Sequence, residues 1–98
     1  IVTNYSGNTD FTISENSCLV DYNLIKVRKG EYPLSKNQVW ADPNIDQAAE
    51  YMRRLVEDDT YRNTIAKAGY SYIKTNHNSE TVGRNYRSRF IELGLIDN

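Results

Sequence analysis

The first eleven residues join a short apolar strand to a run of turn-forming residues, and they constrain the fold of this chain most strongly. They open with two β-branched side chains, which favour a strand, and continue as Tyr-Ser-Gly-Asn-Thr-Asp-Phe. Gly7 predicts backbone with positive φ, because glycine enters that region without steric cost. Asn8 or Thr9 predicts the N-cap of a short helix that carries Phe11. The stretch is therefore typical of a strand that turns into a helix.

A loop of this kind is also a candidate ligand site. In open α/β sheets, ligands bind in the crevice beyond the carboxyl ends of the strands. The N–H groups at a helix N-terminus suit a phosphate group there. An ordinary turn that contains a glycine explains the same residues, and both interpretations stay open at this point.

The second half of the chain shows helical periodicity from Asp42 onward. Asn44 is a good N-cap, with Gln47 three residues later as its capping-box partner, and Gly94 is a good residue to end the last helix. The period predicts helices near residues 44–57, 60–75 and 79–93. We expect the apolar stripe of the first of these helices to be buried: Ile45, Ala48, Ala49, Met52, Leu55 and Val56.

Strands are predicted at residues 1–4 and 18–22, with a possible third at 24–27. A short helix between the first two favours parallel pairing, because parallel strands need a crossover connection. Residues 28–39 show no period and are predicted to form a loop, with Trp40 packed against the body of the domain. The predicted fold class is α/β, with two or three strands followed by three helices in one small domain.

The charge pattern excludes some partners. The formal net charge is −1, with four basic and five acidic residues in 1–43 and eight of each in 44–98. A protein that binds a phosphate backbone carries a basic excess, so we predict no nucleic-acid partner. A solvated helix face explains Arg84, Arg87 and Arg89 better than a phosphate site does.

Cysteine and histidine give no cofactor or metal site. Cys18 lies in an apolar strand and is interpreted as a small core side chain. His77 precedes the predicted N-cap Asn78, where a hydrophobic staple with Val82 accounts for it. One histidine and one cysteine make no ligand cluster, so we predict no cofactor and assign no catalytic residue.

Targeting signals are also missing from these residues. No apolar run approaches the roughly 20 residues that cross a membrane, and no signal peptide is recognisable. The chain starts inside a predicted strand and not with methionine. We therefore expect a cytoplasmic chain that is part of a longer protein or a processed product.

Five segments follow one another in an order that belongs to a known family. Residues 1–11 resemble V-I-A-T-x-x-G-G-x-x-E/D-F, and Asn-Ser-Cys-Leu-Val-Asp-Tyr at 16–22 stands in the place of G-x-L-V. Ala-Asp-Pro-Asn at 41–44 matches a D-P helix start. Residues 57–62 then match a D-D-x-x-R turn, and 77–80 stand in the place of F-S-W-E. In this order and spacing the chain resembles the C-terminal portion of the retaining group 1 glycosyltransferases, which have the GT-B fold.

The resemblance implies a partial Rossmann-like domain, with its strands and loops at 1–43 and its C-terminal helices at 44–98. It implies that the parent protein transfers a sugar from a nucleotide-diphosphate donor, a UDP- or GDP-sugar, with retention at the anomeric carbon. The donor-binding residues that it carries over form a phosphate loop: Ser6, Gly7, Asn8, Thr9 and Asp10.

The chain also departs from the family. Ser6 stands where the family has the first of two glycines. The E-x7-E segment and the first domain of the family have no counterpart in these residues, so we expect the isolated chain to be inactive. We also expect self-association through the exposed edge of the first strand. The alternative function is a stand-alone interaction module that uses the C-terminal helices.

Overall fold

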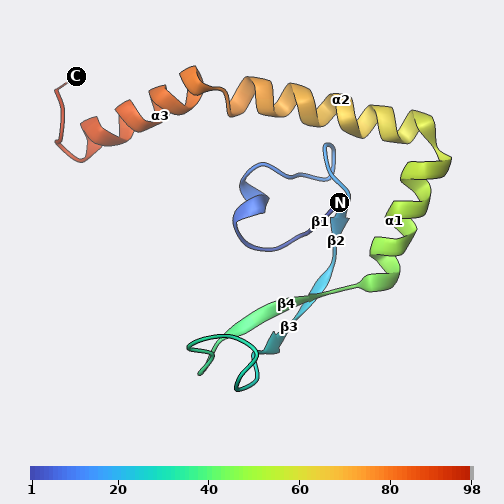
Figure 1. Ribbon diagram of the computed structural model, residues 1–98. Helices are drawn as coiled ribbons and strands as arrows, with labels where there is room; N and C mark the ends of the chain where they lie inside the picture. Colours follow the sequence, from blue (N-terminus) through green and yellow to red (C-terminus); the bar gives the residue numbers. More distant parts are fainter. Residues whose placement is uncertain (98) are drawn as a thin grey trace.

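A computed structural model describes residues 1–97 and contains two small sheets and three α-helices (Figure 1). β1 (Val2–Thr3) and β2 (Leu19–Val20) form the first sheet, and a short 3-10 helix, η1 (Ser6–Asp10), lies between them. β3 (Tyr22–Lys26) and β4 (Val39–Pro43) form the second sheet. The helices are α1 (Ile45–Glu57), α2 (Asp59–Asn76) and α3 (Ser79–Glu92).

The molecule is flat and open. Its principal extents are 51 × 45 × 15 Å and its radius of gyration is 18.4 Å, whereas a compact domain of this length would have about 13 Å. α1 meets α2 at a corner, and α3 continues from α2 along one side, so that the helices form an L around β1, η1 and β2 (Figure 1). The β3–β4 hairpin extends away from α2 and α3 (Figure 1).

The first sheet confirms the parallel pairing that the crossover predicted. Val2 lies opposite Leu19 and Thr3 opposite Val20, and the two strands run in the same direction. All three helices also lie within about two residues of their predicted bounds. The chain is thus an α/β protein with a parallel pair at its N-terminus.

The second sheet corrects the prediction for residues 28–43. The possible third strand is present as β3, but it pairs antiparallel with β4, a fourth strand that the sequence did not predict. β4 was missed because its last residues, Asp42 and Pro43, have the composition of a helix start. Proline is tolerated at a strand end, where no ladder N–H is lost. Trp40 lies on β4 opposite Ile25 and is exposed, so its predicted packing against the body is wrong.

The core is small and lies around β2. Within residues 1–97, the buried side chains are those of Thr12, Asn16, Cys18 and Val20. Two of the four are polar, so this core depends on hydrogen bonds as well as on apolar burial.

The predicted burial of the α1 stripe is wrong for most of its members. Ile45, Met52 and Val56 are exposed, and the Val56 side chain reaches 77% exposure. Ala48 and Leu55 are half-buried. The reason is that neither sheet nor another helix covers this side of α1 within the described residues, so an apolar stripe of good helical spacing faces solvent.

The start of α1 is tied to the strand region by a side chain. The Asn44 Oδ1 atom accepts from the Gln47 N–H at 3.0 Å, which confirms the N-cap. The Gln47 side chain does not return to Asn44 as a capping box requires. Its Nε2 instead donates to Asp21 Oδ2 at 3.0 Å, and its Oε1 accepts from the Asp21 N–H at 2.6 Å. Gln47 therefore joins α1 to the residue between β2 and β3.

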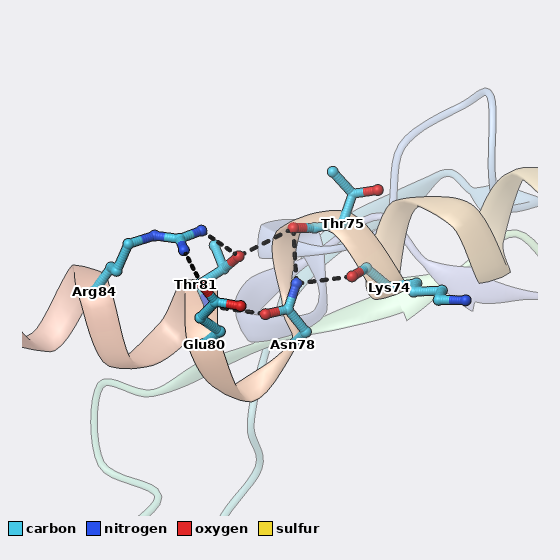
Figure 2. Close-up of polar contacts among 6 residues, drawn as sticks. All are labelled: Lys74, Thr75, Asn78, Glu80, Thr81 and Arg84. Atoms are coloured by element: carbon cyan, nitrogen blue, oxygen red, sulfur yellow. Dashed lines mark hydrogen bonds and ion pairs between the residues drawn. The ribbon is translucent and has the colours of Figure 1, made fainter.

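The bend between α2 and α3 is fixed by Asn78 (Figure 2). Its Oδ1 accepts from the Thr81 N–H at 2.8 Å, which caps α3. Its Nδ2 donates to the carbonyl oxygens of Lys74 at 2.8 Å and Thr75 at 3.1 Å, at the end of α2. One side chain thus satisfies backbone groups of both helix ends.

The end of α3 confirms the glycine stop. Gly94 has a φ of 67°. The Leu95 N–H donates to the Phe90 carbonyl and the Gly94 N–H to the Ile91 carbonyl, both at 2.9 Å. This pair of bonds is the Schellman motif, in which glycine takes the left-handed position.

Candidate functional site

The candidate loop follows the carboxyl end of β1, as predicted, but its left-handed residue is not the glycine. Tyr5 is extended, with a φ of −149°, and Ser6 then has a φ of 67°. Gly7 lies inside η1 and has no positive φ, so the prediction for Gly7 is wrong. η1 begins at Ser6, and the left-handed residue is Ser6, one position before Gly7.

Two polar side chains of the loop donate hydrogen bonds to nearby backbone carbonyl groups. Asn8 Nδ2 donates to the Thr3 carbonyl at 2.9 Å and to Thr12 Oγ1 at 3.3 Å. Thr9 Oγ1 donates to the Ser6 carbonyl at 2.6 Å. Neither residue caps η1, whose N-cap position is Tyr5 without a side-chain bond, and Phe11 lies beyond its end. Asn8 and Thr9 therefore hold the loop in shape.

The remaining loop residues form its exposed surface. Ser6, Gly7 and Asp10 are exposed. The first N–H groups of a helix have no acceptor within the helix, and in η1 they belong to Ser6 and Gly7. These N–H groups suit an anion. Asp10 lies at the other end of η1, so it does not cap the first turn, and an ionised carboxylate there can only accept hydrogen bonds.

A buried residue that the sequence analysis missed supports the loop from behind. Asn16 Oδ1 accepts from the Ile13 N–H and from Ser17 Oγ, both at 2.9 Å. Its Nδ2 donates to the Phe11 carbonyl at 3.1 Å. The signal was present, since asparagine in a Glu-Asn-Ser turn commonly bonds its neighbours' backbone. Asn16 thus fixes the chain between η1 and β2.

The loop region is attached to the helices through β2. Cys18 is buried, which confirms its core role, and its Sγ lies 3.4 Å from the Tyr61 Oη of α2. This hydrogen bond, together with burial, raises the pKa of Tyr61 above its ordinary value of 10.0. The Arg54 guanidinium lies 3.6 Å from the centre of the Tyr61 ring and opposes that shift. Tyr61 of α2 therefore links α1 to Cys18, the residue directly before β2.

His77 also contacts the loop region, through its ring. It lies at the predicted position before the Asn78 cap. The Phe11 ring packs edge-on at 6.2 Å between centroids, and the Tyr72 ring lies at 5.8 Å. These aromatic neighbours explain the histidine by packing and give it no catalytic partner.

Two of the three arginines of α3, Arg84 and Arg89, bond to side chains of their own helix. Arg84 Nη1 lies 2.8 Å from Glu80 Oε1 and its Nη2 donates to Thr81 Oγ1 at 3.1 Å (Figure 2). Arg89 Nη1 lies 2.9 Å from Glu92 Oε2. These exposed pairs along one helix fit the solvated face that the sequence predicted.

Cavities occur away from the candidate loop. One of about 410 Å³ lies in the β3–β4 hairpin, against Tyr32, Leu34 and Trp40, and another of about 240 Å³ lies on α3 at Val82 and Tyr86. Within residues 1–97, no group of three or more His, Cys, Asp or Glu side chains could hold a metal ion. Over the same residues, no helix has both the length and the apolar character of a membrane span.

Comparison of the chain with protein-family models, with curated proteins and with solved structures gave no match. The residues and the geometry described above are therefore the basis for the function of this chain.

Proposed function

We propose that this chain is the C-terminal part of a retaining glycosyltransferase of the GT-B fold, in which the loop Ser6–Asp10 contributes to the site of a UDP- or GDP-sugar diphosphate. In such a reaction, negative charge grows on the diphosphate as the glycosidic bond breaks. Backbone N–H groups at a helix start stabilise charge of that kind without reorganisation. The enzyme would act in the cytoplasm, and the isolated chain would be inactive.

The left-handed conformation of Ser6 is the observation that carries the proposal. The chain resembles a family that has glycine at this position, and the backbone at Ser6 has a φ of 67°, which favours glycine. The glycine of the family pattern and the left-handed backbone of this chain thus fall at the same position. The parallel β1–η1–β2 unit supports the proposal, because it presents the loop at the carboxyl end of a strand.

The exposed face of α1 gives further support. Ile45, Met52 and Val56 form a regular apolar stripe without cover. A helix that packs on a Rossmann-like sheet needs such a stripe. Under the proposal, the stripe covers sheet strands that the parent protein supplies, and the flat shape of the chain follows from their absence.

The experiment uses the full-length parent and changes only Ser6. Ser6→Val places a β-branched side chain at a positive φ, where it costs on the order of 1–3 kcal/mol. We expect transfer from a panel of UDP- and GDP-sugars to fall about tenfold or more, while the circular dichroism of the protein stays unchanged. Ser6→Gly is the matched variant, and we expect it to keep full activity.

Full activity in Ser6→Val with an unchanged donor KM would show that the loop is not part of the donor site. A parent that transfers no sugar from any donor in the panel would contradict the proposed reaction itself.

One observation favours the alternative, an interaction module that uses the C-terminal helices. Tyr86, Phe90 and Leu93 of the α3 region are exposed, and apolar surface of this kind often marks a protein contact. A stable complex that forms through α3 and is lost in Tyr86→Ser, in a parent without transferase activity, would favour this function.

A further inference from the structure

The loop between β3 and β4 holds an apolar residue in an unfavourable place. Leu34 has a φ of 56° and its side chain is 94% exposed. Leucine is rare in the left-handed region, and an exposed leucine gains nothing from burial. Neither the backbone nor the packing of this chain therefore explains a leucine at this position.

Other apolar side chains surround Leu34. Tyr32 is 65% exposed, and Trp40 and Val39 of β4 are exposed as well. With Val27 and Pro33 they line the open cavity of about 410 Å³. This group, which we name the hairpin tip (residues 27–40), projects on the side of the molecule away from α2 and α3 (Figure 1).

Basic residues are concentrated at the same place. The four basic residues of the first half of the chain all fall within residues 26–36. All four are exposed, and none forms an ion pair within residues 1–97: Lys26, Arg28, Lys29 and Lys36. The one acidic residue among them, Glu31, accepts the Arg28 N–H at 2.8 Å through Oε2. Residues 1–43 are thus near neutral as a whole, but the hairpin within them is basic.

We propose that the hairpin tip binds the surface of an anionic lipid bilayer and inserts Leu34 among the acyl chains. Tyr32 and Trp40 would lie at the headgroup level, where amphipathic aromatic rings are favoured. The surrounding lysines and arginine would contact acidic headgroups, each with an attraction that falls off within a Debye length. This binding is independent of the sugar-transfer proposal.

The chemistry of the tip favours a bilayer over an acidic protein. Leu34 is 94% exposed, so it projects beyond the open hollows of the hairpin that it helps to line. A fluid bilayer accepts a projecting apolar side chain without shape complementarity, whereas a protein interface requires packing close to that of a protein interior. Cations that flank the apolar residues are the arrangement that an anionic surface attracts.

The chain supplies its own reporter, because Trp40 is its single tryptophan. Vesicles of phosphatidylcholine, alone or mixed with phosphatidylglycerol, are added to the 98-residue chain while tryptophan emission is recorded. We expect a blue shift with the anionic vesicles, reversed by high salt, and little change with the neutral ones.

Two changes at the tip separate the apolar and electrostatic parts. Leu34→Asn suits a positive φ, so the fold should be kept while binding to anionic vesicles falls about tenfold. Lys29→Glu with Lys36→Glu should weaken binding about tenfold or more. Leu95→Asn is the control for an exposed leucine elsewhere, and Arg53→Glu with Lys67→Glu changes the net charge equally on α1 and α2. Both controls should bind like the unchanged chain.

Several results would overturn the proposal. One is the absence of an emission shift with anionic vesicles, and another is an equal emission shift with neutral vesicles. A third is a loss of vesicle binding in the control variants equal to that in the tip variants. A shift on raising the protein concentration alone would assign the tip to a second copy. Binding to polyglutamate as tight as binding to the vesicles would assign it to an acidic protein.

Discussion

The β1–η1–β2 segment and the β3–β4 hairpin are both two-stranded, and they follow one another in the chain, but they are held together differently. The first contains the four buried side chains of the described residues, and its loop is fixed by side chains such as Asn8 and Asn16. The hairpin has a longer ladder, with five paired positions, and every residue of β3 is exposed. A short pair of strands can therefore have more buried side chains and side-chain hydrogen bonds around it than a longer pair has.

The largest expected difference between the β1–η1–β2 segment and the hairpin is in the free energy of unfolding lost when a valine of each is shortened to alanine. Val20 is 2% exposed on β2, whereas Val39 is 45% exposed on β4. Val20→Ala should lower the free energy of unfolding by about 2 kcal/mol, because it leaves a cavity. Val39→Ala should lower it by about 0.5 kcal/mol or less. Urea unfolding of both variants makes the comparison, and equal losses would show that the core does not lie at β2.

A smaller effect, of the opposite sign, is expected at the two left-handed residues. Ser6 and Leu34 have φ values of 67° and 56°. Replacing either with glycine removes the clash of the Cβ atom and should stabilise the chain by about 1 kcal/mol. The same urea measurement applies. Gly7→Ala is the converse variant: because Gly7 has no positive φ and an added Cβ meets open space, alanine should be tolerated there and should add about 0.4–1 kcal/mol by lowering the entropy of the unfolded chain. A loss of stability in Ser6→Gly would contradict the assigned backbone of the loop.

The smallest effect is a pH dependence that arises at Tyr61, beside β2. The hydrogen bond to Cys18 raises the pKa of Tyr61 above 10.0, so the folded chain holds this proton more tightly than the unfolded chain. The resulting stabilisation is complete below pH 10.0 and is lost as the pH rises through the folded pKa. Tyr61→Phe should reduce the fall in stability above that pH. An identical pH profile in the variant would show that the contact does not form.

The sequence predicted the elements whose signals are local. Helix caps at Asn44 and Asn78 and the stop at Gly94 depend on residues within one or two turns, and all three are present. The parallel β1–β2 pair followed from the crossover between them.

The sequence did not predict features that depend on longer contacts. β4 was missed because its pairing partner lies 13 to 21 residues away in the chain, as in Lys26 with Val39 and Tyr22 with Pro43. The burial of the α1 stripe was predicted from its period, but burial needs a second surface, and the described residues cover only part of the stripe. At the candidate site, the positive φ was placed on Gly7 and not Ser6, since glycine permits that conformation without requiring it.

We propose that the loop Ser6–Asp10 binds a nucleotide diphosphate, and an amide-resolved NMR titration of the chain with UDP and GDP tests this binding. The chain carries only part of the proposed site, so we predict a Kd on the order of 1 mM or weaker (about 4 kcal/mol at most). The largest shifts should be those of the Ser6 and Gly7 amides, with α1 to α3 unchanged. Shifts that concentrate on the hairpin tip or on α3, or no shift at the loop at nucleotide concentrations well above about 1 mM, would contradict the claim.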